Sequence, residues 1–275
     1  MSWDLAGGVA VVTGAGSGIG RALAQRLAVE KMSLALCDVN ADRLDESAAE
    51  ARLAINENVQ RVTTHLVDVS DASRMREFAD EVVSAHGRAT LLINNAGVAL
   101  HGRFEELSLE DFEWLMRINL WGVVNGTKAF LPVLRHERRA HIANLSSIFG
   151  IIAPAGQTAY AASKFAVRGF TEALRNELAG SNVGVSCVHP GGIRTRIAED
   201  ARMGANTPGS KPEYADAFAR VARHSPEFAA RKIVDGVKRN KARILIGVEA
   251  HALDTAQRIS PARAASLLMG SLRSI

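Results

Sequence analysis

The chain has 275 residues, of which 47% are hydrophobic, so it can bury the core of one large domain without a disulfide or a structural metal. Lys and Arg number 33 against 29 Asp and Glu, and the densest basic run, residues 135–139, follows a predicted helix whose negative end it complements. This near balance argues against a nucleic-acid-binding protein. Because the eight histidines lack zinc spacing, we expect no metal site.

The N-terminus has neither the basic nor the apolar region of a secretion signal, and no apolar run approaches the length of about 18 residues that spans a membrane. The two cysteines, Cys37 and Cys187, lie in different predicted strands. We therefore expect them to be reduced and buried in the core of a cytoplasmic protein that has no transmembrane span.

The first predicted element is a buried strand, residues 9–12, which runs into the glycine-rich turn TGAGSGIG, residues 13–20, and then into a helix over residues 21–30. Glycines let such a turn come close to a diphosphate, while the free N–H groups at the helix start face the anion. The spacing differs from G-x-G-x-x-G, because the glycines that fit are at 14, 18 and 20. No Lys-Ser/Thr pair follows, which excludes a P-loop; the alternative is a glycine turn without a ligand.

The second predicted strand, residues 34–37, ends at Asp38, where a carboxylate can accept hydrogen bonds from the ribose hydroxyls of an adenosine. The same carboxylate would repel a 2′-phosphate, and neither of the next two residues supplies a cation, so the sequence favours NAD over NADP. Arg21 and Arg43 are the cations that could reverse this preference. The alternative is that Asp38 only caps or turns the chain before a helix over residues 42–55.

Two further predicted strands, residues 62–67 and 91–93, end at positions that would extend the same site. Asp68-Val69 follows the first strand, and the small residues of NNAG, residues 94–97, follow the second and let the main chain pass close to a ligand. Ligands bind at the carboxyl ends of parallel strands in open α/β sheets. Asp68 could instead cap a helix that starts at Ser70.

A helix predicted over residues 158–178 places Tyr160 and Lys164 four residues apart on one face. The ammonium would lower the pKa of the phenol, which is ordinarily about 10 and makes tyrosine a poor base at neutral pH. Ser147 adds a hydroxyl upstream, although its neighbour Ser146 could take that role. Together, these three groups can move a proton at an alcohol.

Strands and helices alternate without a linker as far as the last predicted strand, residues 243–246. We expect seven strands in an α/β fold, a doubly wound Rossmann-type parallel sheet with helices on both faces. The strand over residues 183–188 ends at PGGIRT, residues 190–195. Residues 1–275 would form a single dinucleotide-binding and catalytic domain.

From about Val9 to Thr195, the chain resembles the core-length branch of the short-chain dehydrogenase/reductase family, whose active site has the pattern Tyr-x-x-x-Lys. The resemblance rests on TGAGSGIG, NNAG, Asn119 in RINLWG, Ser147 in NLSSIFG, YAASK and PGGIRT, which occur in the order and spacing of the family. It implies an oxidoreductase that transfers hydride between a nicotinamide cofactor and an alcohol or ketone.

The resemblance also implies a role for each matching residue. Tyr160 would be the general acid or base, Lys164 would lower its pKa and hold the nicotinamide ribose, and Ser147 would bind the substrate oxygen. Asn119 lies in a helix predicted over residues 109–134, which it would distort so that its carbonyl positions a water; the alternative is a helix-bending residue with no catalytic part. The implied cofactor contacts are Gly14, Ser17, Gly18, Ile19, Gly20, Asp38, Asp68, Val69, Asn95, Ala96, Gly97, Tyr160, Lys164, Pro190, Gly191, Ile193 and Thr195.

The substrate pocket would be formed by residues 98–102, 149–157 and 197–225, the last as a lid. Their side chains are largely apolar, which favours a hydrophobic secondary alcohol or ketone, although His101 and Arg103 weaken this preference. The lid is polar around Ser210, so we expect it to be mobile until substrate binds.

Residues 249–275 extend past the family core, and Ser260-Pro261 predicts the start of an amphipathic helix there. We expect this helix to make a subunit contact or to cover the pocket rather than to lie on a membrane surface. By analogy with the family, a homodimer or homotetramer would form through the helices over residues 109–134 and 158–178. Two alternatives to an NAD-dependent dehydrogenase are an NADPH-dependent carbonyl reductase and a non-catalytic dinucleotide sensor.

Overall fold

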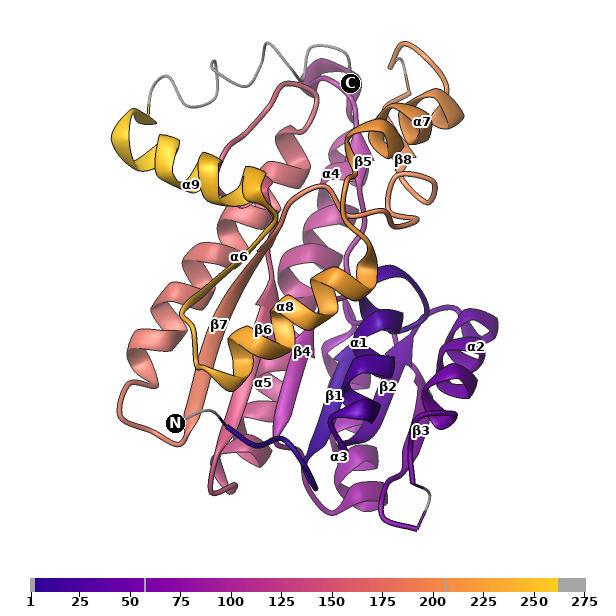
Figure 1. The fold of residues 1–275 in the computed structure, drawn as a ribbon. Coiled ribbons are helices and arrows are strands. Elements are labelled where there is room, and N and C mark those ends of the chain that lie inside the picture. Colours follow the sequence, from indigo (N-terminus) through magenta and orange to yellow (C-terminus); the bar gives the residue numbers. More distant parts are fainter. Residues whose placement is uncertain (1–2, 57, 206, 262–275) are drawn as a thin grey trace.

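The structure is a computed structural model that describes residues 3–56, 58–205 and 207–261. Its centre is a sheet of seven parallel strands in the order β3-β2-β1-β4-β6-β7-β9, with helices on both faces (Figure 1). These strands are β1 (Val9–Thr13), β2 (Ser33–Asp38), β3 (Val62–Leu66), β4 (Leu91–Asn94), β6 (Ala140–Leu145), β7 (Val183–Pro190) and β9 (Arg243–Ile246). The predicted doubly wound sheet is confirmed, and its order reverses between β1 and β4, where such folds bind ligands.

Two layers of helices cover the sheet because successive side chains of a strand point to opposite faces. In β1, Ala10 and Val12 pack in one core cluster with α1, α2 and α8, whereas Val9 and Val11 pack in a second cluster with α3, α5 and α6. The helices are α1 (Gly18–Val29), α2 (Ala41–Arg52), α3 (Ala72–His86), α4 (Leu109–Met116), α5 (Gly122–Arg135), α6 (Thr158–Glu177), α7 (Lys211–Val221), α8 (Pro226–Lys238) and α9 (Val248–Ile259).

The caps of two helices correct alternatives considered for the sequence. Asn40, not Asp38, caps α2, since its side chain accepts a hydrogen bond from the Arg43 amide. Asp71, not Asp68, caps α3 by accepting from the amides of the next turn. The largest shifts among the predicted helix boundaries are that α1 starts at Gly18 rather than at residue 21, α2 ends at Arg52 rather than at residue 55, and α3 starts at Ala72 rather than at Ser70.

The helix predicted over residues 109–134 is interrupted. Between α4 and α5, the residues Arg117–Trp121 form a π-helical turn that contains Asn119. Such turns insert an extra residue into an α-helix and are frequent at functional sites. The sequence expectation that Asn119 distorts its helix is therefore confirmed, and the π-turn gives the form of the distortion.

Three features were missed or misjudged from the sequence. A second sheet pairs β5 (Leu100–His101) with β8 (Arg202–Met203). The polar stretch at Ser210 begins a helix, α7, that was not predicted, and the Ser210 and Glu213 side chains form a capping box at its start. Helix α9 was not predicted, whereas the helix expected from Ser260-Pro261 falls almost wholly on residues 262–275, outside the described residues.

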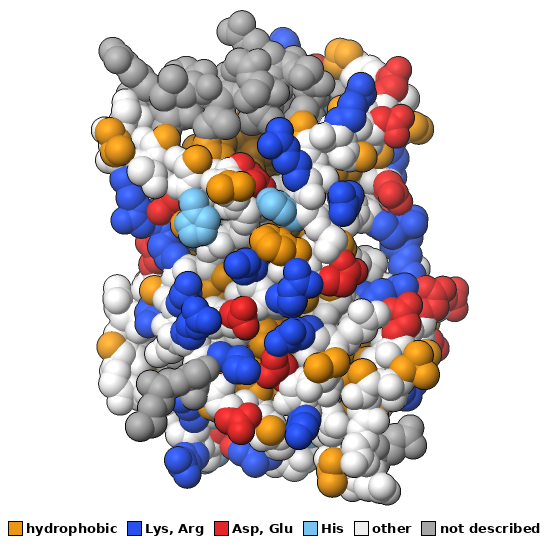
Figure 2. Space-filling view, viewed as in Figure 1, with side chains coloured by type: hydrophobic (Ala, Val, Ile, Leu, Met, Phe, Trp, Pro, Cys, Tyr) orange, Lys and Arg blue, Asp and Glu red, His pale blue; other side chains and the backbone are white. Residues whose placement is uncertain are grey.

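The described surface carries both signs of charge. Figure 2 shows Lys and Arg side chains spread over the face that α8 and α9 occupy, with Asp and Glu side chains between them. Both cysteines are free and buried, as predicted. Across residues 3–56, 58–205 and 207–261, no group of three His, Cys, Asp or Glu side chains is placed to hold a metal ion. None of the helices in these ranges is long and apolar enough to cross a membrane.

Candidate active site

Tyr160 and Lys164 lie one turn apart on α6, at the carboxyl end of the sheet. The Lys164 Nζ lies 5.6 Å from the centre of the Tyr160 ring and donates a hydrogen bond of 3.1 Å to the carbonyl of Leu145, the last residue of β6. Lys164 is only 4% exposed, whereas Tyr160 is partly exposed. The two groups therefore share one face of the helix.

Burial shifts the pKa of both groups. It raises the pKa of Tyr160 to about 12, although the neighbouring Ser147 hydroxyl favours the phenolate, and it lowers the pKa of Lys164 to about 8. In the protein alone the pKa of Tyr160 therefore lies above its ordinary value, because the loss of water around the phenol outweighs the effect of its neighbours. That Lys164 lowers the pKa of Tyr160 stays a prediction.

Two adjacent serines have different partners. The Ser146 hydroxyl is buried and donates to the Lys164 carbonyl at 2.8 Å, which ties the end of β6 to α6. The Ser147 Oγ accepts a hydrogen bond from the Phe149 amide at 3.1 Å, so its own proton can be directed toward the Tyr160 hydroxyl or a ligand. The contacts therefore favour Ser147 over Ser146 as the group that meets a substrate oxygen.

Asn119 is completely buried, and its side chain ties two segments together. Its Oδ1 accepts from the Val98 amide at 2.8 Å, and its Nδ2 donates to the Val98 carbonyl at 3.0 Å and to the Ser163 hydroxyl at 3.2 Å. The Ser163 hydroxyl donates in turn to the Tyr160 carbonyl at 2.7 Å. The π-turn thus fixes both the chain after β4 and the first turns of α6.

The glycine-rich turn after β1 has the shape of a phosphate cradle. Gly14 and Gly18 have φ angles of +63° and +52°, and a Cβ at Gly20 would lie 2.0 Å from the Gly14 carbonyl oxygen. Ser17 is the N-cap of α1, and its side chain makes no capping hydrogen bond. Because first-turn amides have no acceptor within the helix, they remain available to an anion, and the turn fits the diphosphate of a dinucleotide.

The chain matches a known family over most of its length. Residues 8–206 match the family model described as short chain dehydrogenase. The chain belongs to the short-chain dehydrogenase/reductase family. SadH of Mycobacterium tuberculosis, which is named as an oxidoreductase, is 47% identical over 256 residues, covering 92% of this chain and 91% of SadH. The protein is therefore an NAD(P)-dependent dehydrogenase/reductase of the short-chain family.

Two solved structures of similar fold agree with this assignment. A short-chain dehydrogenase/reductase from Burkholderia phymatum, in complex with NAD, is 31% identical with a TM-score of 0.86, covering 94% of this chain and 95% of that one. An alcohol dehydrogenase from the archaeon Thermococcus sibiricus, complexed with 5-hydroxy-NADP, is 29% identical with a TM-score of 0.70, covering 86% and 93%.

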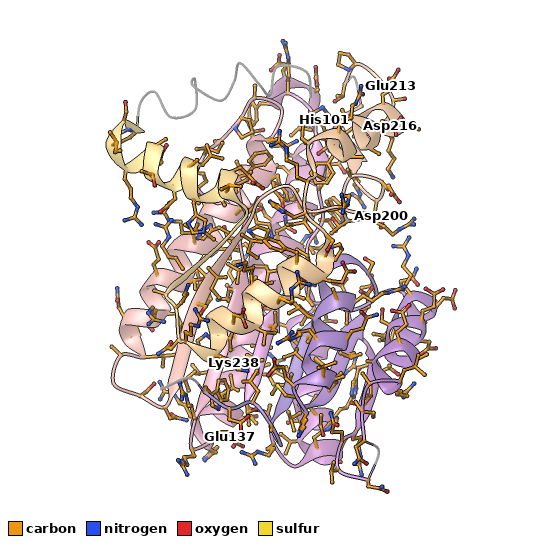
Figure 3. All side chains as sticks on the ribbon, viewed as in Figure 1. His101, Glu137, Asp200, Glu213, Asp216 and Lys238 are labelled. Carbon is orange, nitrogen blue, oxygen red and sulfur yellow. The ribbon has the colours of Figure 1, made fainter. Side chains whose placement is uncertain are left out.

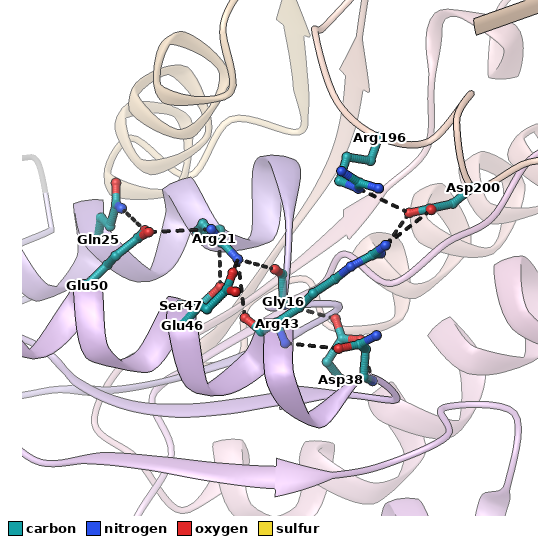
Figure 4. A network of polar contacts seen from close by, with 11 residues as sticks. Gly16, Arg21, Gln25, Asp38, Arg43, Glu46, Ser47, Glu50, Arg196 and Asp200 are labelled. Carbon is teal, nitrogen blue, oxygen red and sulfur yellow. Dashed lines mark hydrogen bonds and ion pairs between the residues drawn. The ribbon is translucent and has the colours of Figure 1, made fainter. Parts of the chain in front are cut away.

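In this short-chain dehydrogenase, the charges around Asp38 are paired within the protein (Figure 4). The Asp38 carboxylate accepts hydrogen bonds from two backbone amides, at 2.8 and 3.0 Å. Arg43 pairs with Asp200 at 2.8 Å, and Arg21 pairs with Glu46 at 2.8 Å. Both cations that could attract a 2′-phosphate are thus already engaged with carboxylates.

Two loops of this short-chain dehydrogenase converge beside the glycine turn. A Cβ at Gly18 would lie 3.0 Å from the Thr195 methyl carbon, so the loop after β7 reaches the start of α1. A Cβ at Gly97 would lie 3.3 Å from the Lys164 Nζ, so the chain after β4 passes directly over the lysine. The side chain of Asn95 holds this chain to β1 by donating to the Thr13 carbonyl at 2.8 Å. The adjacent amide of Ala96 bonds to the Thr13 hydroxyl.

The remaining expected cofactor residues differ in accessibility. Asp68 is exposed, whereas Val69 is only 5% exposed and packs against α5, where a Cβ at Gly122 would lie 2.6 Å from it. Pro190 ends β7 and leads into Gly191. Ile193 is 3% exposed and belongs to the core cluster with α1 and α8, so its side chain helps to hold the loop in place.

The segments predicted to form the pocket and its lid contain a polar aromatic cluster. His101 of β5 stacks on Tyr214 of α7, with ring centres 4.3 Å apart and an angle of 21°. The Gln157 Nε2 lies 3.1 Å from the His101 Nδ1 and 3.4 Å from the Tyr214 hydroxyl. Figure 3 shows His101 beside α7. From the sequence, His101 is only a polar exception among apolar pocket residues. No local pattern indicates its contact with Tyr214, because the two residues are remote in the chain.

Sequence reasoning also missed the contribution of α9. Leu253 packs against Ile151 and Ile152 in a segment predicted to line the pocket. Glu249 contacts the loop after β7 and His224 at the end of the predicted lid. No local pattern could have indicated these contacts, since they join segments that are remote in the sequence.

Proposed function

We propose that this short-chain dehydrogenase/reductase interconverts a hydrophobic secondary alcohol and its ketone, with NAD as the preferred cofactor and Tyr160 as the general acid or base. The observation that carries the proposal is that Tyr160, Lys164 and Ser147 meet at the carboxyl end of the sheet, beside the glycine turn. Asn119 completes the set by fixing the segments that carry them.

The residues would act on the substrate oxygen. In oxidation, the alcohol gives its proton to the Tyr160 phenolate while the Ser147 hydroxyl donates a hydrogen bond to the same oxygen. In reduction, the Tyr160 hydroxyl donates its proton to the ketone oxygen, which becomes the hydroxyl of the alcohol. The nicotinamide supplies the hydride acceptor or donor and, when oxidised, a positive charge that opposes the raised pKa of the phenol.

Burial determines what Lys164 contributes. Because burial lowers the pKa of Lys164 to about 8, its amine can gain or lose a proton at a pH close to neutral. In this proposal, Lys164 also binds the nicotinamide ribose, and the backbone carbonyl of Asn119 positions a water that links Lys164 to solvent. A Cβ at residue 97 would crowd the Lys164 amine. Because Gly97 has no Cβ, the lysine has the space that a contact with the ribose needs.

The preference for NAD rests on charge. Asp38 places a carboxylate at the end of β2, where it would accept hydrogen bonds from the adenosine ribose hydroxyls and repel a 2′-phosphate. Arg43 and Arg21 are both paired with acids, which weakens the case for the NADPH-dependent alternative. The diphosphate would lie on Gly14, Ser17, Gly18, Ile19 and Gly20, and the adenine against Asp68 and Val69.

The proposed preference for a hydrophobic substrate follows from the apolar segments that are expected to line the pocket. Ile151 and Ile152 are buried under α9, and α7 would form the lid over the substrate. We also propose that residues 1–275 act as one catalytic domain. A cytoplasmic location and a homodimer or homotetramer, expected from the sequence and from family analogy, remain part of the proposal.

A Tyr160→Phe variant tests the catalytic assignment. Removing the hydroxyl should lower turnover by a factor on the order of 10² to 10⁴, while NADH binding changes by less than about threefold. Turnover is followed at the nicotinamide absorbance band with 1-phenylethanol, 2-octanol and the matching ketones as probes. A variant as active as the wild type would refute the role of Tyr160.

Two further measurements separate the alternatives. Fluorescence titration with NADH and NADPH tests the preference, and tighter binding of NADPH by tenfold or more would refute the assignment of Asp38. A protein that binds NADH but turns over no alcohol or ketone would favour the sensor. Activity only toward sugars or acyl thioesters would refute the apolar-pocket argument.

A further inference from the structure

Glu249, the second residue of α9, reaches back to two segments at the edge of the active site. Its Oε1 accepts a hydrogen bond from the Gly192 amide at 3.2 Å, and its Oε2 lies 3.3 Å from the His224 Nε2. Gly192 belongs to the loop after β7, and His224 lies between the lid helix α7 and α8. The side chains of His224 and Glu249 are 21% and 30% exposed, so water only partly reaches the contact.

The carboxylate of Glu249 fills space that glycines leave open. A Cβ at Gly191 would lie 2.0 Å from its Oε1, and a Cβ at Gly247 would lie 2.4 Å from the same atom. Gly247 is also the N-cap of α9 and has a φ angle of +94°, a conformation that other residues rarely adopt. The backbone on both sides of the carboxylate is therefore shaped to receive it.

The two segments that Glu249 contacts are also joined to each other, but by few bonds. The His224 amide donates to the Gly192 carbonyl at 3.1 Å, and the Arg194 amide donates to the His224 carbonyl at 2.9 Å. The His224 ring stacks on Phe228, with ring centres 4.8 Å apart. Because two backbone hydrogen bonds hold a short pairing only weakly, a third attachment through a side chain matters for its order.

We propose that Glu249 is a positioning residue that locks the cofactor loop, residues 190–195, to the end of the lid, residues 221–224. The proposal rests on the proposed function, because it assigns the cofactor and the substrate to these two segments. One carboxylate takes a hydrogen bond from each segment, so its removal leaves the Gly192 amide and the His224 ring without that partner. Order in the cofactor loop and order in the lid are then coupled.

A Glu249→Ala variant tests the lock without relying on turnover. Amide hydrogen exchange in residues 190–195 and 221–224 should become about tenfold faster, while exchange in β1 and β4 stays unchanged. The dissociation constant of NADH, measured by fluorescence titration, should rise about fivefold or more. With 1-phenylethanol as the probe, KM should rise by a larger factor than kcat falls.

Two variants separate a positional role from a loss of charge. Glu249→Gln keeps an oxygen that can accept from Gly192, so its NADH affinity should lie within about twofold of the wild type. Glu110→Ala is the matched control, since Glu110 is also the second residue of a helix, α4, and is exposed. It reports the effect of removing an acid from the first helical turn and should leave NADH binding unchanged.

A His224→Ala variant removes the lid half of the lock and remains informative if Glu249→Ala does not fold. The proposal requires faster exchange in residues 190–195 as well as in residues 221–224, because the segments share one carboxylate. A change confined to residues 221–224, or wild-type exchange and NADH binding in Glu249→Ala, would overturn it. If the wild type binds no NADH, the proposed function fails, whereas the exchange data still decide the role of Glu249.

Discussion

The guanidinium of Arg43 forms two contacts with the carboxylate of Asp200, at 2.8 Å from Nη1 to Oδ2 and at 3.3 Å from Nη2 to Oδ1. These residues are 157 positions apart, and their pairing joins α2 to the segment that follows Thr195 (Figure 4). The bond with Asp200 raises the pKa of Arg43, so the guanidinium stays charged. Under the proposed function, this pairing keeps the charge engaged, so that Arg43 is not free to attract a 2′-phosphate.

An Asp200→Asn variant should therefore bind NADPH more tightly than the wild type does, by about three- to fivefold, which corresponds to the strength of a partly exposed ion pair. The freed Arg43 can turn toward the 2′-phosphate, although Asp38 still repels it. NADH affinity should change by less than about twofold, since its ribose hydroxyls carry no charge. Parallel titrations with NADH and NADPH measure both values.

The neighbouring acid Glu199 provides the control for this substitution. Glu199 pairs with Arg196 at 3.3 Å and makes no ion pair with Arg43, so Glu199→Gln removes one negative charge from the same segment without freeing Arg43. Equal gains of NADPH affinity in the two variants would show that net charge matters and that the Arg43–Asp200 pairing does not.

Replacing Lys164 by Met should stabilise the fold at pH 7 while it abolishes turnover. The pKa of Lys164 is about 8 in the folded protein and about 10.4 in an unfolded chain, so below pH 8 the folded state bears the cost of a buried charge. That cost is about 3 kcal/mol, and the lost hydrogen bond to Leu145 offsets about 1 kcal/mol, which leaves a gain of about 2 kcal/mol.

The pH dependence tests the physical reason for this gain. The free energy of unfolding of the wild type should rise between pH 8 and about 10.4, because the unfolded chain binds the proton more tightly over that window. The advantage of Lys164→Met should therefore shrink as pH rises through the same window. Urea unfolding at pH 7 and pH 9.5 measures it, and an equal difference at both values would contradict the burial argument.

Much of the architecture could be predicted because its signals are local. The strand of residues 9–12 and the glycine turn after it are adjacent in the chain, and the right-handed connection rule then sets how successive strands are placed. The shared face of Tyr160 and Lys164 also follows from local geometry, since four residues are close to one helical turn. These parts of the site need no knowledge of tertiary contacts.

The features that escaped prediction depend on segments remote in sequence. Glu249 meets Gly192 across 57 positions, and no local period marks either residue as a partner of the other. The raised pKa of Tyr160 has the same origin, because spacing shows the nearby ammonium but not how much water the surrounding protein excludes. Asp71, and not Asp68, caps α3. The sequence cannot distinguish them, because two acids three residues apart both fit the start of a helix.

The stacked pair of His101 and Tyr214 should govern substrate affinity through the lid. His101→Ala removes both the stacking and the contact with Gln157, so we expect KM for 1-phenylethanol to rise about tenfold with a smaller change in kcat. His101→Phe keeps an aromatic ring against Tyr214 and should hold KM within about threefold of the wild type. Steady-state kinetics of both variants measure this, and equal effects would show that stacking is not what holds the lid.

Two glycine substitutions in helices should have opposite effects on stability. A Cβ at Gly20 would lie 2.0 Å from the backbone oxygen of Gly14, which cannot move without opening the glycine turn, so Gly20→Ala should cost about 2 kcal/mol or more. Gly169 lies within α6 and is exposed, and beyond its chain neighbours and its own helix backbone no atom lies within 4 Å of the added carbon. Gly169→Ala should therefore gain about 0.5–1 kcal/mol through helix propensity. Urea unfolding measures both, and a Gly20→Ala variant as stable as the wild type would show that the turn is not packed as tightly as these distances require.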